Sequence, residues 1–368
     1  MISGDDEMMT TTSTSEPVRQ AWTLADMSPA YFGLVMATGI VSLAAFMMEH
    51  RLLAVFLFYL NIGQYGLLCM LYGLRAWRYP RRFFGDMVAH ATGPGYFTAV
   101  AGTGILASQF MVLGDSYVAG KFLWIVALLL WLGLTYTIFT AFTVKHDKPT
   151  LDKGINGGWL LAVVATQSLT VTSALLAAQS GPVYRLELNF FALSTWLWGG
   201  MLYIWLMVLI FYRYAFFRFS PGDLAPPYWI NMGAMAISTL AGSLLILNAP
   251  QAPYLTSLLP FLKGFTIFYW ATGTWWIPML LLLGVWRHIY ERFPLSYDPL
   301  YWGAVFPLGM YVACTWQLDQ AMDFGFLGNL THVFFYIALV AWGVTFAGML
   351  HRLAGILRRK AVNYTRTH

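Results

Sequence analysis

The sequence predicts an all-α integral membrane protein with ten transmembrane helices, and three observations carry this prediction. The 368 residues are 59% apolar and only 10% charged, whereas a soluble domain carries about 25% charged residues. Ten apolar stretches are long enough to cross the hydrocarbon core, which takes about 20 residues in a helix. A sequence motif also recurs in alternate stretches. These features exclude a soluble globular domain, and they exclude nucleic acid as a partner because the basic residues do not gather on one face.

The predicted spans divide the chain into three parts. Residues 1–28 are polar and are expected to form a disordered cytosolic tail. Residues 29–350 form the transmembrane domain, and residues 351–368 form a basic cytosolic tail. The lipid environment requires each span to satisfy its own backbone hydrogen bonds, so each is expected to be a helix. The predicted spans are 29–48, 52–74, 93–113, 120–144, 158–178, 190–212, 229–248, 262–286, 301–318 and 328–350.

The basic residues set the orientation of these spans. Seventeen of the 21 Lys and Arg residues fall on one side of the predicted membrane and four on the other. Loops rich in Lys and Arg stay in the cytosol. We therefore expect a multi-pass protein of the plasma membrane, the inner membrane in a bacterium, with both termini in the cytosol. No Lys or Arg falls deep within a span.

An internal repeat indicates how the spans are grouped. Residues 31–42 and 96–107 agree at six of twelve positions, at an offset of 65 residues. Weaker copies of the motif occur in the fifth and seventh spans. An offset of this length contains two helices with their loops, so ten spans make five helical hairpins. Every copy runs in the same direction, which favours hairpins arranged around an axis along the membrane normal.

The repeated positions form a stripe of small, mildly polar residues on each odd-numbered span. Their spacing of three and four residues places them on one helix face. Such stripes serve either close helix packing or the wall of a pore, and the sequence leaves both interpretations open. As candidate pore-lining residues the stripes contain Val35, Thr38, Gly39, Ser42, Val100, Thr103, Gly104, Thr166, Gln167, Asn231 and Ser238.

Several motifs resemble the tellurite-resistance/dicarboxylate transporter family, which includes plant slow-type anion channels, bacterial tellurite-resistance protein A and fungal malate transporters. The similarity covers roughly residues 29 to 350. One departure is Ala91 after His90, where the family often has His-Pro, so the kink of the third span is expected at Pro94. The motifs are Pro29-Ala-Tyr-Phe32, Val35-Met-Ala-Thr-Gly-Ile40, Trp229-Ile-Asn-Met-Gly-Ala234, Trp270-Ala-Thr-Gly-Thr-Trp-Trp276 and Phe306-Pro307.

The resemblance implies a quasi-five-fold arrangement of five hairpins around a central pore. It implies that odd-numbered spans line the pore, that even-numbered spans surround them, and that protomers form a homotrimer with one pore each. It also implies that Phe306 occludes the pore as its gate. Pro307 frees a carbonyl beside it, and Gly309 allows close backbone approach, so both join the candidate pore-lining residues.

The sequence therefore predicts anion transport, with channel-like passage of small inorganic anions or dicarboxylates. Hydroxyls and amides bind anions weakly, as conduction requires. The alternative is a proton-linked carrier of malate-like C4-dicarboxylates, or a transporter related to tellurite or sulfite, with His90 as the candidate proton-sensing residue. The sequence contains no HExxH motif and no paired intramembrane acids, so we expect no enzyme activity, no metal and no cofactor.

Overall fold

The computed structural model describes residues 23–366 and is helical throughout, with no strand in this range. A helix covers most of each predicted stretch, and several helices extend beyond it. The first to the fifth are α1 (Gly33–Met47), α2 (Arg51–Arg78), α4 (Phe97–Val112), α5 (Tyr117–Val144) and α7 (Leu161–Gln179). The sixth to the tenth are α8 (Pro182–Phe216), α9 (Ile230–Asn248), α11 (Leu259–Val285), α12 (Trp302–Met322) and α13 (Gly328–Arg366).

Eight of these helices are long and apolar enough to cross a membrane, judged by length and composition over the described residues. This finding confirms a multi-pass, all-helical membrane protein. The two helices outside this set are α4 and α12, so a total of ten crossings stays a prediction. Both are among the most buried helices of the molecule.

Burial separates the long helices into two groups. Helices α1, α4, α7, α9 and α12, here called the inner helices, are buried over most of their length. Helices α2, α5, α8, α11 and α13, the outer helices, expose large apolar side chains such as Leu52, Leu129 and Leu282. Each inner helix packs against the outer helix that follows it in the chain.

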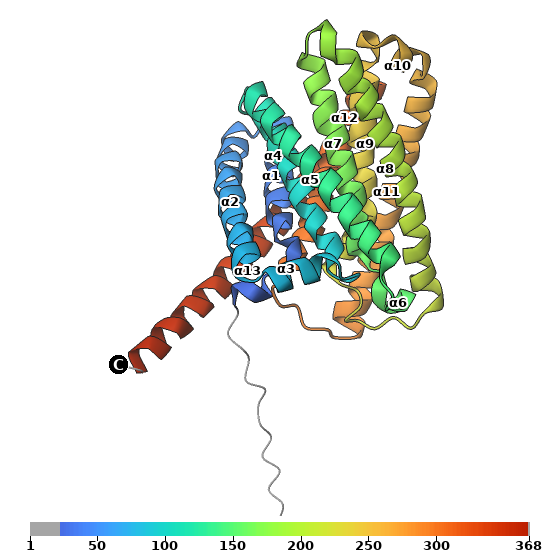
Figure 1. Ribbon diagram of the computed structural model, residues 1–368. Coiled ribbons are helices and arrows are strands. Elements are labelled where there is room, and N and C mark those ends of the chain that lie inside the picture. Colours follow the sequence, from blue (N-terminus) through green and yellow to red (C-terminus); the bar gives the residue numbers. More distant parts are fainter. Residues whose placement is uncertain (1–22, 367–368) are drawn as a thin grey trace, which may run out of the picture.

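Contacts between successive inner helices form a closed ring. Helix α1 packs against α4, α4 against α7, α7 against α9, α9 against α12, and α12 against α1. Figure 1 shows the bundle from the side, with the short helices α3 (Pro80–Met87) and α6 (Leu151–Gly154) at one end and α10 (Pro253–Ser257) at the other. Helix α13 extends beyond the end that carries α3 and α6.

The two predicted tails differ in part from the structure. Residues 1–22 of the expected N-terminal tail lie outside the described residues. The next residues form the short 3₁₀ helix η1 (Leu24–Asp26), in which Ala25 is buried, and Met27 after it is also buried. At the other end, α13 continues to Arg366 instead of ending near residue 350.

Candidate functional site

Every inner helix begins with a 3₁₀ turn that carries an aromatic residue in its last or next-to-last position. Proline lies early in four of these turns, where its missing N–H costs no helical hydrogen bond. Pro94 is one of them, so it begins the third predicted span and does not kink it. The turns are η2 (Pro29–Phe32), η3 (Gly93–Tyr96), η4 (Gly157–Leu160), η5 (Pro226–Trp229) and η8 (Pro299–Tyr301), with the aromatic residues Tyr31, Tyr96, Trp159, Tyr228 and Tyr301.

A cavity of about 600 Å³, here called the vestibule, lies where these turns meet. All five turns contribute to its wall through the same position, the residue directly before the aromatic. Prolines and glycines are common in this wall, so backbone and small side chains form much of it. The five equivalent wall residues are Ala30, Gly95, Gly158, Pro227 and Leu300.

A second, much smaller cavity adjoins the vestibule and shares part of its wall. This cavity, here called the throat, has a volume of about 20 Å³, and a single water molecule needs about 10–15 Å³. The throat therefore has room for about one water molecule. Its wall contains the residue two positions after each aromatic: Gly33, Thr98, Leu161, Ile230 and Gly303.

Phe306 lines the throat on the side of α12. It lies in the second turn of α12, is fully buried, and lines the throat together with Met36 of α1. The next residue, Pro307, packs against Gly233 of α9, where a Cβ atom would lie 2.7 Å from the proline ring. An apolar ring thus stands where the cavity narrows to the size of one water molecule, and its action as a gate stays a prediction.

The predicted stripe hydroxyls face the outer helices. Thr38 accepts a hydrogen bond from the indole of Trp342 at 3.0 Å, and Thr166 accepts one from the indole of Trp131 at 2.9 Å. The hydroxyl of Thr103 lies 3.0 Å from that of Tyr65. These contacts correspond to the packing interpretation that the sequence left open.

The carboxamides and serines of the stripe also contact outer helices. Gln167 donates to the carbonyl of Trp196 at 3.1 Å, and Asn231 donates to the hydroxyl of Tyr214 at 3.2 Å. Ser42 donates to the carbonyl of Ala54 at 2.7 Å. The carbonyl of Ser238 accepts a hydrogen bond from the Trp196 indole at 2.9 Å.

The remaining stripe positions lie at contacts between neighbouring helices or are simply buried. Gly104 approaches Ser168 of α7, and Gly309 approaches Ile40 and Val41 of α1. Gly39 faces Asn61 and Gln109, and Val35 lies against Gly102. Val100 is fully buried. For all these positions, pore lining stays a prediction.

His90 lies outside the helices, in the loop between α3 and η3. Its ring stacks on Phe142 at a centroid distance of 4.2 Å, and the Trp159 indole donates to its carbonyl at 3.0 Å. Burial, together with Lys145 and Lys148, lowers the pKa of His90 below its usual value. The neutral imidazole is therefore favoured at neutral pH.

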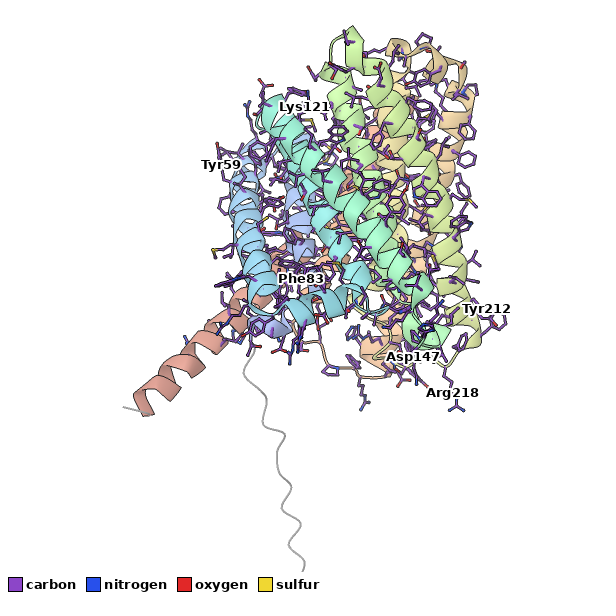
Figure 2. All side chains as sticks on the ribbon, in the orientation of Figure 1. Tyr59, Phe83, Lys121, Asp147, Tyr212 and Arg218 are labelled. Carbon is purple, nitrogen blue, oxygen red and sulfur yellow. The ribbon has the colours of Figure 1, made fainter. Side chains whose placement is uncertain are left out.

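Charged residues line the vestibule but not the throat. Lys153, Arg213 and Arg218 contribute positive charge, and Asp152 and Asp223 contribute negative charge. Figure 2 shows Arg218 at the end of the bundle that also carries Asp147, opposite Lys121. The vestibule therefore carries a small excess of positive charge.

Arg213 is the buried member of this group. Its guanidinium contacts Asp223 at 3.0 Å, the Ile155 carbonyl at 2.9 Å and the Tyr228 hydroxyl at 2.5 Å. A similar cluster occurs at the end of α2, where the buried Arg75 forms an ion pair with Asp86. Each guanidinium thus ties the end of an outer helix to the turn that begins the next inner helix.

The throat residues Thr98, Leu161 and Ile230 and the vestibule residue Arg213 were not among the site residues predicted from the sequence. The signal for the throat residues was the aromatic residue of each repeat, because the throat position always lies two residues after it. For Arg213 the pattern of Arg, then Asp ten or eleven residues later, then Tyr in the next turn occurs at both Arg75 and Arg213.

Comparison with known proteins identifies the family. The sequence profile of the voltage-dependent anion channel family matches residues 26–350. Two uncharacterized transporters of Methanocaldococcus jannaschii are 23% and 24% identical over 92% and 86% of this chain, covering 99% and 90% of their own lengths. An uncharacterized membrane protein of Mycobacterium tuberculosis is 36% identical over 43% of this chain and 80% of its own length. These matches confirm the family that the sequence motifs indicated, and the chain belongs to the voltage-dependent anion channel family of membrane transport proteins.

Proposed function

We propose that this protein conducts small anions passively along the axis enclosed by its inner helices, and that Phe306 is the gate. One observation carries the proposal. Equivalent residues from all five inner helices line the vestibule and then the throat, and Phe306 lies at the throat. Family membership supports anions as the transported class.

The same observation supports the quasi-five-fold arrangement that the sequence predicts. The closed sequence of contacts among the inner helices and the repeated 3₁₀ turns describe one unit used five times. In this proposal α4 and α12 are also membrane spans. Their burial behind outer helices explains why α12 tolerates a less apolar sequence than a helix that faces lipid.

The distribution of basic residues supports a cytosolic vestibule. The seventeen basic residues of the majority side include Lys153, Arg213 and Arg218, which line this cavity. Positive charge at a pore mouth raises the local concentration of anions. All five inner helices also begin here, and the N-terminal end of a helix carries partial positive charge.

The composition of the inner helices supports conduction over proton coupling. Helices α1, α4, α7 and α9 contain no Asp, Glu, Lys, Arg or His, and α12 contains only Asp319 near its C-terminal end. A proton-coupled transporter usually carries an ionisable residue within its spans. Homotrimeric assembly in the inner membrane is part of the proposal and rests on the family resemblance.

The test is anion flux through purified protein in proteoliposomes with Phe306→Ala beside the wild type. We expect the variant to pass chloride or nitrate faster because the throat loses its apolar plug. Phe335→Ala is the matched control, since Phe335 is equally buried but lies on the outer helix α13. An unchanged flux in folded Phe306→Ala protein would contradict the gate.

A second measurement separates the channel from the carrier. With no membrane potential, a pH difference is imposed across the proteoliposomes and malate uptake is followed. A channel does not accumulate malate on a proton gradient alone, whereas a proton-linked carrier does. Accumulation that His90→Gln abolishes would establish the carrier instead.

A further inference from the structure

Arg213 occupies an unusual position for a guanidinium. Only 6% of the residue is exposed, yet it contributes to the wall of the vestibule. It lies near the end of α8, and the Phe219 ring covers it at 5.5 Å. Its Nε atom has no hydrogen-bond partner within residues 23–366. Arg213 is thus a buried cation that lines the cavity and has one N–H donor without a hydrogen-bond partner in the described residues.

Asp223 satisfies this cation only in part. One carboxylate oxygen accepts a hydrogen bond from Arg213 at 3.0 Å. The other accepts from the backbone N–H and the hydroxyl of Ser220, at 2.9 Å and 2.6 Å. The ion pair is therefore single-pronged, whereas a guanidinium can offer a carboxylate two parallel hydrogen bonds. Asp223 also has a second anchor, so it remains held if the arginine is taken by another anion.

We propose that Arg213 is an anion-binding site of the vestibule, and that Asp223 is a tethered carboxylate that competes with the incoming anion for it. The ligand class is a small planar oxyanion, a nitrate or a carboxylate, because two oxygen atoms in one plane match the guanidinium fork. The proposal rests on the proposed function, since it places this site on the path to the throat. It adds the residue that binds the anion and the residue that limits the binding.

The cluster around Arg75 provides a matched control within the same chain. Arg75 is also buried, pairs with Asp86, contacts the Tyr96 hydroxyl at 3.3 Å and lies under an aromatic ring, Phe83. Unlike Arg213, it does not line the vestibule. Both clusters combine a buried arginine with an aspartate, a tyrosine hydroxyl and an aromatic ring, but only Arg213 lines the cavity.

The competitor is ionised over the whole neutral range. The hydrogen bonds from Ser220 and the charge of Arg213 lower the pKa of Asp223 below its usual value. Replacing Asp223 with Asn removes the competing charge and keeps the side-chain size. We therefore expect Asp223→Asn to bind anions more tightly, and Arg213→Gln to bind them more weakly.

The experiment is isothermal titration calorimetry of the detergent-purified full chain with sodium nitrate, sodium acetate or sodium malate, at constant ionic strength set with sodium chloride. We expect Asp223→Asn to lower the apparent Kd for nitrate and acetate roughly two- to fivefold, the scale of one lost competing contact between partly exposed charges. Arg213→Gln should abolish the signal. Arg213→Lys keeps the charge without the fork and should bind the planar oxyanions no better than chloride.

The controls decide the outcome. Arg75→Gln and Asp86→Asn should bind like the wild type. Unchanged binding in Arg213→Gln, or no gain in Asp223→Asn, would overturn the proposed site, and the second variant decides the question if the first does not fold. Binding without any flux in Phe306→Ala proteoliposomes would contradict the conduction proposal while leaving the site intact. Flux in Phe306→Ala proteoliposomes without Arg213-dependent binding would contradict the anion-binding site while leaving the conduction proposal intact.

Discussion

The indole N–H of Trp342 donates a hydrogen bond to the Thr38 hydroxyl at 3.0 Å and so joins the last long helix, α13, to the first, α1. Each of the other outer helices makes a corresponding contact with the inner helix that follows it. Tyr65 of α2 reaches α4, Trp131 of α5 reaches α7, Trp196 of α8 reaches α9 and Trp270 of α11 reaches α12. Every hairpin is therefore joined to the next by a hydrogen bond from its outer helix, here called a clasp. The clasp of Trp342 joins the fifth hairpin to the first.

The clasp between α13 and α1 can be measured with a double-mutant cycle. Trp342→Phe and Thr38→Val each remove one partner and keep most of the apolar volume. We expect each to lower the melting temperature, with a coupling free energy of about 0.6–1 kcal/mol for one interhelical hydrogen bond. Differential scanning fluorimetry with a lipophilic dye and a chemical-denaturation series would measure both.

Trp275→Phe is the control for this cycle, because Trp275 is 56% exposed on the outer helix α11. It should leave the melting temperature nearly unchanged. A coupling free energy near zero would contradict the clasp. An altered anion flux in Thr38→Val with unchanged stability would instead support pore lining by Thr38.

Gly39 permits a close approach of α1 to α2 and α4. A Cβ atom here would lie 2.7 Å from the Nδ2 atom of Asn61 and 3.0 Å from the Oε1 atom of Gln109, which are themselves hydrogen-bonded at 2.7 Å. Gly39→Ala should therefore destabilise the protein by about 1–3 kcal/mol, the usual cost of overpacking. Thermal unfolding in detergent measures the change.

Gly63 offers the comparison for Gly39. It lies on α2, and a Cβ atom there would meet nothing within 4 Å. Gly63→Ala should be neutral or slightly stabilising, since alanine is the better helix former. Equal effects of the two substitutions would show that the Gly39 contact does not limit packing.

The fold was largely predictable, because span length and the 65-residue repeat are direct consequences of the bilayer and of the hairpin unit. The sequence did not predict whether the stripe residues face the pore axis or the outer helices. Small polar residues such as Thr38 suit a pore wall and a helix contact equally, and only the tertiary structure shows that Trp342 meets that hydroxyl. The throat position of Leu161 was also hidden, since it depends on where the 3₁₀ turn before α7 ends.

The orientation of the bundle can be tested with single cysteines. Lys121 and Arg218 are exposed and lie at opposite ends in Figure 2. In a chain carrying Cys69→Ser and Cys314→Ala, a membrane-impermeant maleimide applied to intact cells should label Lys121→Cys and leave Arg218→Cys unlabelled. Permeabilised cells provide the control, because both should then react. Labelling of Arg218→Cys in intact cells would place the vestibule outside.

His90 gives a prediction for the pH dependence of stability. Burial and the charges of Lys145 and Lys148 lower its pKa in the folded protein, while a histidine in the unfolded chain titrates near about pH 6.5. As the pH falls below about 6.5, the unfolded state takes up a proton that the folded state binds less readily, so this histidine lowers stability under acidic conditions. His90→Gln should therefore reduce the loss of melting temperature between pH 7 and pH 5.

Lys148→Gln is the counterpart of this change. Removing that charge raises the pKa of His90, so the folded protein takes up the proton more readily and the acid-induced loss of stability should again be smaller. The Lys148 ammonium donates to the Thr143 carbonyl at 2.9 Å on an exposed surface, and the loss of this contact should shift the melting temperature similarly at every pH. If the anion flux changes with pH because His90 titrates, the midpoint of that change should lie below pH 6.5. The midpoint should shift to higher pH in Lys148→Gln. A step that does not move in this variant belongs to another group.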